Sequence, residues 1–139
     1  MATAQVVKQI EAPVGAVWEH LADFARIRPG GPIESAEYEG EGIGMIRRLG
    51  MGGGMVVERL EFHDEAARRF TYAIINDDCP LPFSDYEATV QLGDNGDGTT
   101  TVIWTGTFEP KDAPEADAVH TATGIYAGAI KGARLELES

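Results

Sequence analysis

The sequence predicts an α+β fold in which one curved antiparallel sheet packs against a long C-terminal helix. Three observations lead to this prediction. Apolar and polar residues alternate with a period of two through most of residues 33–108, which is typical of strands. Short, turn-forming segments rich in glycine or charge separate these stretches, as expected for a meander. From about residue 114 to residue 137 the apolar residues recur instead at helical spacing.

Length and charge limit the classes of protein that need be considered. The 139 residues indicate one domain, spanning residues 1–139. A net charge of −12 argues against a nucleic-acid partner and against binding to anionic membranes. Cys79 is the only cysteine, and no basic and apolar leader precedes residue 10, so we expect a cytoplasmic location. No apolar stretch approaches the ~20 residues that span a membrane.

The N-terminal third predicts a strand followed by two short helical segments. Residues 3–11 form the strand, and Pro13 suits the first turn of a helix that runs to about Phe24. A second short helical segment reaches Ile27, and the proline- and glycine-rich residues 28–32 end it. The apolar residues of the first helix recur at helical spacing: Val14, Val17, Trp18 and Leu21.

The rest of the chain predicts six strands and one long helix. The strands cover residues 33–41, 44–50, 55–62, 70–75, 85–92 and 100–108. The apolar stripe of the helix consists of Val119, Thr123, Tyr126, Ile130, Ala133 and Leu137. Gly124, Gly128 and Gly132 lie roughly opposite, and each glycine costs a helix about 1 kcal/mol relative to alanine. Either docking on the sheet alone stabilises this helix, or a second subunit packs on it to form a homodimer.

Alternation in the central hairpin turns two charged residues toward the interior. Arg59 and Glu61 identify the solvent face of strand 55–62, so Glu58 lies on the other face. The residues assigned to the inner face are Met45, Arg47 and Leu49 in the first strand and Val56, Glu58, Leu60 and Phe62 in the second. Buried ionisable groups are costly unless they are paired or functional. Arg47 and Glu58 therefore form either a self-contained ion pair or part of a ligand site.

A cavity is expected where the helix does not fill the curve of the sheet. Arg47, Glu58, Tyr86 and Trp104 all point toward this space in the predicted arrangement. If Tyr86 is buried, its hydroxyl group needs a hydrogen-bond partner. These four residues are the first candidates for contact with a ligand.

Residues 10–24, Ile-Glu-Ala-Pro-Val-Gly-Ala-Val-Trp-Glu-His-Leu-Ala-Asp-Phe, resemble the opening signature of the polyketide cyclase/dehydrase and START/Bet v 1-like (SRPBCC) superfamily. The resemblance covers essentially the whole chain. It implies the helix-grip fold: a curved seven-stranded antiparallel sheet around a long C-terminal helix, with two short helices after the first strand. It also implies an apolar cavity that takes a small hydrophobic ligand.

Four later segments are similar to the branch that holds the plant abscisic acid receptors and onion lachrymatory factor synthase: residues 44–47, 57–60, 85–89 and 102–104. In that synthase an arginine and a glutamate perform a sulfenic-acid rearrangement, and they align by motif with Arg47 and Glu58. The lysine that holds the hormone in the receptors is replaced here by Glu34. The gate loop becomes residues 50–54 and the latch loop residues 80–82, which would still flank a cavity mouth.

Two functions follow from this arrangement. In the first, the protein is a cyclase, dehydratase or isomerase that needs no cofactor, with Glu58 as general acid/base, Arg47 stabilising an oxyanion and Tyr86 donating a hydrogen bond. In the second, a non-catalytic carrier, the same residues orient the polar head of a ligand. Its apolar body would contact Met45, Leu49, Met55, Leu60, Trp104 and Tyr126. A completely filled core would instead make the Arg47–Glu58 pair structural.

Other motifs predict no metal or nucleotide site. His20, His63 and His120 lack the spacing of metal ligands. The glycine-rich residues 50–54 precede a strand, whereas a dinucleotide loop precedes a helix. Residues 94–98 resemble a calcium loop in composition only and read as a hairpin turn.

Overall fold

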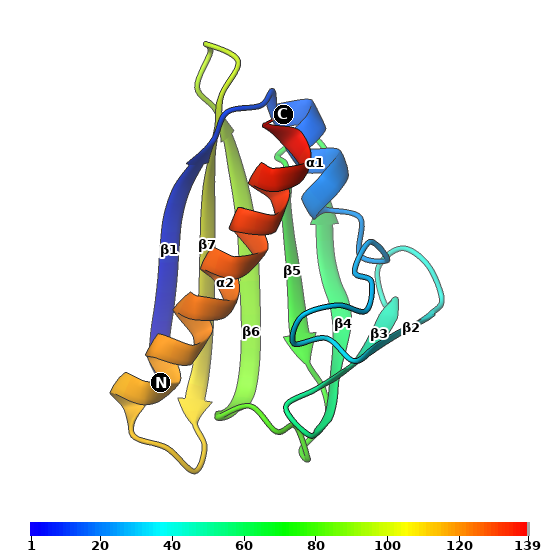
Figure 1. Cartoon of the computed structure of the whole chain (residues 1–139), viewed down its shortest axis with the longest axis vertical. Helices are drawn as coiled ribbons and strands as arrows, with labels where there is room; N and C mark the ends of the chain where they lie inside the picture. Colours follow the sequence, from blue (N-terminus) through cyan, green and yellow to red (C-terminus); the bar gives the residue numbers. More distant parts are fainter. Residues whose placement is uncertain (139) are drawn as a thin grey trace.

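The computed structural model describes residues 1–138 as one seven-stranded antiparallel sheet with a short and a long helix (Figure 1). The strand order is β1-β7-β6-β5-β4-β3-β2, so the first strand lies at one edge of the sheet, beside the last strand, and β2 lies at the other edge. The elements are β1 (Ala2–Ile10), α1 (Val14–Leu21), β2 (Ser35–Glu39), β3 (Ile46–Met51), β4 (Gly54–Asp64), β5 (Arg69–Ile74), β6 (Phe83–Asp94), β7 (Thr100–Pro110) and α2 (Glu115–Leu137). The predicted α+β helix-grip fold is confirmed.

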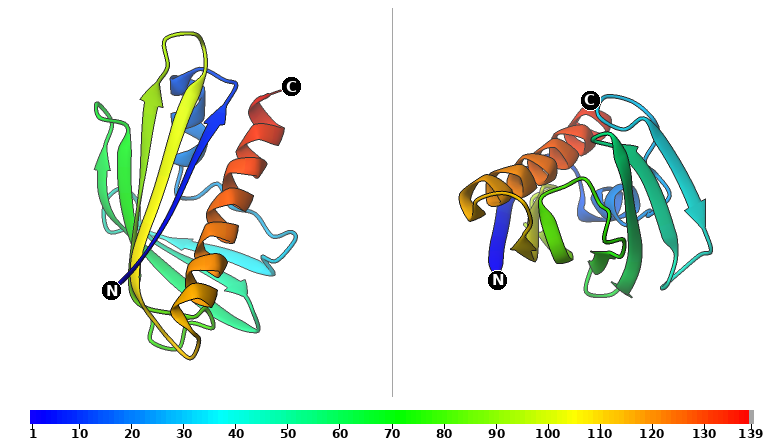
Figure 2. Two further views of the ribbon diagram at one scale, coloured as in Figure 1. Left: turned by 90° about the vertical axis from the view of Figure 1, so that its left-hand side faces the viewer. Right: turned by 90° about the horizontal axis from the view of Figure 1, so that it is seen from below.

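The sheet curls around α2, which crosses its concave face (Figure 2). In Figure 1 this helix lies over β1, β7 and β6, whereas β3, β4 and β5 extend beyond it. Trp104 on β7 and Tyr126 on α2 anchor the contact, since their rings stack with centroids 5.3 Å apart. Helix and sheet therefore share one apolar core.

Helix α1 begins after Pro13 and buries the four apolar residues that its spacing predicted. The indole Nε1 of Trp18 donates a 2.6 Å hydrogen bond to Glu65 Oε2, which ties the helix to the β4–β5 turn. The second helical segment is reduced to a single turn, in which the Arg26 amide donates to the Asp23 carbonyl at 3.1 Å. The chain from residue 22 to residue 34 then crosses in front of β4 and β3 (Figure 1).

The N-terminal half of α2 is rotated relative to the predicted stripe. Ala118 and Ala122 are fully buried, whereas Val119 and Thr123 are only half-buried. Small side chains on the inner face let the helix approach β1, which offers the buried Ala2 and Ala4. Further along, the predicted residues do face the core: Tyr126, Ile130 and Ala133. The three glycines of this helix are exposed.

A β-bulge in β4 ends the predicted alternation early. The pairing with β5 shifts between Leu60 and Phe62, so one extra residue enters β4. Phe62 was predicted to face the core but is 39% exposed, and the Arg69 guanidinium lies over its ring. Alternation holds only while strands stay in register, and the inner face of β4 therefore ends at Leu60.

Candidate functional site

Arg47 on β3 and Glu58 on β4 form a buried ion pair on the concave face. The antiparallel register places them directly opposite each other, as the alternation of the hairpin predicted. Arg47 Nε donates to Glu58 Oε1 at 2.6 Å. The side chains keep only 7% and 10% of their surface exposed. Charges at this depth are stable only with such a partner.

The segment after α1 covers the arginine of this pair. Arg47 Nη1 donates to the Phe24 carbonyl at 3.3 Å, and its Cζ lies 3.9 Å from the centroid of the Phe24 ring. The ring of Tyr72 lies on β5 with its centroid 5.4 Å from the same Cζ atom. Cation–π contacts of this kind strengthen when they are desolvated. Two aromatic rings and one carbonyl therefore fix the guanidinium beside Glu58.

Glu58 keeps one carboxylate oxygen available. Oε1 accepts the hydrogen bond from Arg47, whereas Oε2 accepts none from any residue in the described part of the chain. Although Oε2 has no hydrogen-bond partner, it is not a fully buried atom and therefore retains some accessible surface. An ionised carboxylate has lone pairs for several donors. Oε2 could therefore meet a polar group of a ligand.

Three tyrosines continue the polar surface from the ion pair toward α2. The hydroxyl groups of Tyr86 and Tyr126 are hydrogen-bonded at 2.5 Å, and both side chains are buried. Tyr72 accepts a 3.2 Å hydrogen bond from Trp104 Nε1. The predicted need of Tyr86 for a partner is thus met by a residue of α2.

Burial keeps these phenols in their neutral form. Burial, reinforced by the nearby negative charge of Glu58, raises the pKa of Tyr72 to about 12. Burial likewise raises the pKa of Tyr86 well above its ordinary value and that of Tyr126 as well. A phenol with a raised pKa remains a hydrogen-bond donor across the physiological range.

Gly106 on β7 makes room for the Tyr126 hydroxyl group. A Cβ atom at residue 106 would lie 1.9 Å from that oxygen, far inside van der Waals contact. Only glycine therefore lets α2 bring its tyrosine to Tyr86.

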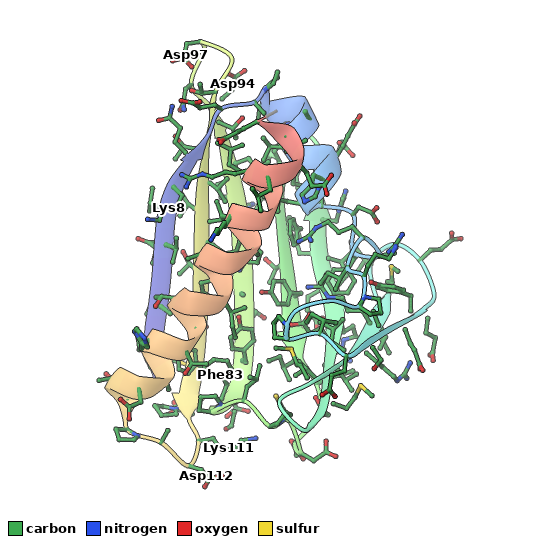
Figure 3. The ribbon with its side chains drawn as sticks, in the orientation of Figure 1. Lys8, Phe83, Asp94, Asp97, Lys111 and Asp112 are labelled. Atoms are coloured by element: carbon green, nitrogen blue, oxygen red, sulfur yellow. The ribbon has the colours of Figure 1, made fainter. Side chains whose placement is uncertain are left out.

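A cavity of about 570 Å³ opens where β5 and β6 separate. Their pairing stops at Ala73 and Glu87, so the end of β5 and the beginning of β6 lie apart. Figure 3 labels Phe83 and Lys111 at this end of the sheet. The lining of this cavity combines residues from the inner and outer faces of the sheet with residues of the adjoining loops: Arg59, Ile74, Ile75, Asn76, Asp77, Phe83, Ser84, Asp85, Tyr86 and Lys111. Of the four residues expected to point into a cavity, only Tyr86 lines this one.

The predicted ligand-contacting residues occupy three different surroundings. Leu60, Trp104 and Tyr126 are buried in the main core, and Met45 packs against it. Leu49 belongs to a separate small cluster that contains Val56 and Cys79. Met55 was assigned to the ligand surface but is 36% exposed. It shares the outer face with Val57 and Arg59, as its odd position in the strand requires.

The two loops that correspond to gate and latch touch each other. Pro80 from the β5–β6 loop packs on the β3–β4 turn, where a Cβ atom at Gly54 would lie 3.2 Å from the proline Cγ. Lys111 Nζ donates to the Cys79 carbonyl at 2.6 Å and holds the β5–β6 loop from the other side. The β3–β4 turn and the β5–β6 loop are therefore in direct contact.

Tyr72 and Phe24 contact Arg47 but were not predicted as site residues from the sequence. Alternation in strand 70–75 places Tyr72 on the same face as Phe70 and Ile74, and a tyrosine on that face was a usable signal. Phe24 lies in a segment without regular structure, where no periodicity shows which way a side chain points.

His63 Nε2 lies 3.8 Å from Glu65 Oε1, but two such groups do not make a metal site. Within residues 1–138, no three His, Cys, Asp or Glu side chains are grouped to hold a metal ion. Among the same residues, no helix is both long and apolar enough to cross a membrane.

Comparisons with known proteins agree on fold and family. The family model described as polyketide cyclase/dehydrase and lipid transport matches residues 1–138. An uncharacterized protein from Bacillus thuringiensis is 27% identical, with 99% of this chain and 100% of that chain covered and a TM-score of 0.85. XoxI from Bacillus cereus is also 27% identical, with coverage of 100% and 97% and a TM-score of 0.86.

A more distant structure shares the fold alone. Ara h 8.0201 is 22% identical, with 95% of this chain and 94% of that chain covered and a TM-score of 0.76. No curated protein sequence matched the chain. The matching family and fold point to a hydrophobic ligand, without indicating which one.

Proposed function

Since the chain belongs to the polyketide cyclase/dehydrase and lipid transport family of the START/Bet v 1-like superfamily, we propose that it binds a small hydrophobic molecule on the concave face of the sheet. We propose further that it transforms this molecule by cofactor-independent cyclisation, dehydration or isomerisation. Arg47 and Glu58 carry the chemistry, and Tyr86 assists from β6.

The available oxygen of Glu58 is the observation that carries this proposal. A carboxylate that served only to neutralise Arg47 could turn both oxygens to protein donors. Here Oε1 is fixed by Arg47 at 2.6 Å while Oε2 accepts no hydrogen bond from residues 1–138. Glu58 pairs with Ile74 on β5, and the buried Val56 and Leu60 flank it on the same face of β4, so the surface next to the carboxylate is apolar and suits a hydrophobic molecule.

The chemistry requires a proton to move and a negative charge to be stabilised. Glu58 Oε2 takes a proton from carbon or oxygen of the substrate and returns it to another atom of the same molecule. Arg47 already donates to Glu58 and the Phe24 carbonyl, and its guanidinium has five N–H groups, so it can also meet a developing oxyanion. The neutral Tyr86 hydroxyl supplies a further donor.

A carrier without catalysis is the second candidate. The cavity between β5 and β6 reaches Tyr86 but is not lined by Arg47 or Glu58. The ion pair is also covered by Phe24, so a ligand could reach the tyrosines without touching it. In that function the pair orients the β3–β4 hairpin, and the ligand leaves unchanged.

Comparison of what co-purifies with the wild type and with Glu58→Gln separates the two functions. Native mass spectrometry followed by organic extraction identifies the bound molecule in each preparation. An enzyme lacking its base retains substrate, whereas the wild type holds product, so the two masses or isomers should differ. A carrier should hold the same compound in both.

Glu61→Gln is the matched control, since Glu61 lies on the outer face of the same strand and pairs with Arg59. This variant should co-purify with whatever the wild type holds. If both wild type and control are empty and also fail to bind the neutral dye N-phenyl-1-naphthylamine, the proposal of a hydrophobic ligand is wrong. The core is then filled, and the ion pair is structural.

A further inference from the structure

The strand ladder on both sides of β6 is interrupted beside the cavity of about 570 Å³. Pairing with β5 stops at Ala73 and Glu87, and pairing with β7 shifts between Ser84 and Glu87. Within residues 1–138, Asp85 and Tyr86 therefore pair with neither neighbouring strand. Hydrogen-bonded strands lie only about 4.8 Å apart, so a molecule can pass between two strands only where their ladder has ended.

The β-bulge at this point turns two aromatic residues to the same side. Phe83 and Tyr86 are three residues apart, so strict alternation would place them on opposite faces of the sheet. Asp85 lies between them with a φ of 51°, in the left-handed region that residues other than glycine rarely adopt. Both rings are consequently buried, and they stack with centroids 5.0 Å apart. The bulge thus gives the cavity an aromatic wall.

The cavity extends from exposed residues to residues of the core. Ile75, which is 38% exposed, and the exposed Asp85 line its outer part. Ile74 and the buried Tyr86 also line it. Ile74 lies directly opposite Glu58 in the β4–β5 ladder, so the two side chains share the inner face of the sheet. The cavity therefore leads from solvent to the neighbours of the proposed site.

The β5–β6 loop is packed on one side and hollow on the other. Toward the β3–β4 turn, Pro80 lies so close that a Cβ atom at Gly54 would be 3.2 Å from it. On the opposite side, Lys111 Nζ donates to the Cys79 carbonyl at 2.6 Å, and a second cavity of about 410 Å³ lies there. An entrance between the two loops would require the Pro80 contact to break, whereas the gap between β5 and β6 is already present.

We propose that the ligand reaches the concave face through the gap between β5 and β6, with Ile75 at its outer end, and that this ligand is uncharged. This inference rests on the proposed function, because it supplies the route to the same site. The inner lining residues, Ile74, Phe83 and Tyr86, offer apolar surface and one phenol. A charged molecule would lose its hydration beside them without gaining a counter-ion.

Changing the size of the side chain at residue 75 tests the route. Ile75→Trp narrows the gap and Ile75→Ala widens it, and neither change falls in the buried core. Stopped-flow fluorescence with the neutral dye N-phenyl-1-naphthylamine gives the association and dissociation rate constants. We expect Ile75→Trp to lower both rate constants about tenfold and Ile75→Ala to raise both. The Kd should stay unchanged, because a residue that only lines a passage alters entry and exit by the same factor.

Val7→Trp and Val7→Ala are the matched controls, because Val7 is an exposed β-branched residue on β1 and lines neither of these cavities. Both controls should exchange the dye at the wild-type rates. Unchanged rates in both Ile75 variants would overturn the passage and leave the proposed function standing. Faster dissociation with weaker affinity in Ile75→Trp would also overturn it, since Ile75 would then border the bound dye. Failure of the wild type to bind the dye would overturn both proposals.

The charge of the ligand is tested with a dye of the same skeleton. The anionic 8-anilino-1-naphthalenesulfonate differs from N-phenyl-1-naphthylamine by one sulfonate group. Measurement at about 0.5 M salt screens the net charge of −12, so that long-range repulsion does not decide the result. We expect the anionic dye to associate with the wild type at least tenfold more slowly. Equal association rates for the two dyes would overturn the assignment of an uncharged ligand.

Discussion

The concave face has a charged end at Arg47–Glu58 and a phenolic end at Tyr86–Tyr126, and the two are stabilised in different ways. At the charged end a guanidinium and a carboxylate neutralise each other beneath Phe24. At the phenolic end neutral hydroxyl groups share a hydrogen bond, and Tyr86 lines the cavity between β5 and β6. Charge can be buried only in compensated sets, whereas a phenol needs one partner.

This difference bears on function. A site that needs a proton acceptor at neutral pH must use Glu58, because the phenols remain protonated there. A site that needs only donors and apolar surface could use the phenolic end alone. The enzyme and carrier hypotheses therefore correspond to the two ends of the same face.

The largest effect is expected when the charged end loses one member. Arg47→Met leaves Glu58 buried without a cation and should lower the free energy of unfolding by about 3–5 kcal/mol. Arg47→Met combined with Glu58→Leu removes both charges and should recover most of that loss. Urea denaturation at pH 7 of the wild type, both single variants and the double variant measures the loss, the recovery and the coupling energy of the pair.

A loss of less than about 1 kcal/mol in the free energy of unfolding of Arg47→Met would contradict this prediction, since that value is typical of solvent-exposed ion pairs. The pair would then be solvated in solution, and its distance of 2.6 Å would have little energetic weight.

The buried tyrosines, and Tyr72 among them, should make the free energy of unfolding fall at high pH. The folded-state pKa of Tyr72 is raised from 10.0 to about 12, so its contribution is complete below pH 10 and is lost as pH rises toward 12. Within this window one such tyrosine lowers stability by up to about 1.4 kcal/mol per pH unit. Tyr72→Phe should reduce the slope of unfolding free energy against pH between 10 and 12.

Urea midpoints from pH 9 to pH 11.5 measure this slope. The lost hydrogen bond from Trp104 Nε1 shifts the variant by a constant amount, which the slope does not contain. Equal slopes for wild type and Tyr72→Phe would mean that Tyr72 ionises as readily in the folded protein as in the unfolded chain.

The sequence predicted the charged end better than the phenolic end, for a physical reason. Arg47 and Glu58 lie in one hairpin, where a short glycine turn sets the register and alternation assigns the faces. The Tyr86–Tyr126 bond joins β6 to α2 across 40 residues, and it depends on the space at Gly106. No local pattern encodes that distance.

Departures from periodicity account for the other differences. The bulge in β4 moved Phe62 outward, and bulges leave no clear mark on hydrophobic alternation. Helix α2 turned Ala118 inward instead of Val119, because close packing on β1 favours small residues over more apolar ones.

Removal of one tyrosine hydroxyl group has the smallest expected effect, and it allows the coupling energies at the two ends of the concave face to be compared directly. Tyr86→Phe removes one neutral hydrogen bond and should lower the free energy of unfolding by about 1 kcal/mol. Tyr126→Phe and the double variant complete a double-mutant cycle, whose coupling energy should be a fraction of that for Arg47 with Glu58. A phenolic coupling as large as the ionic one would mean that one neutral hydrogen bond between buried phenols contributes as much to stability as the buried ion pair, and the two ends would then not differ in how strongly they are stabilised.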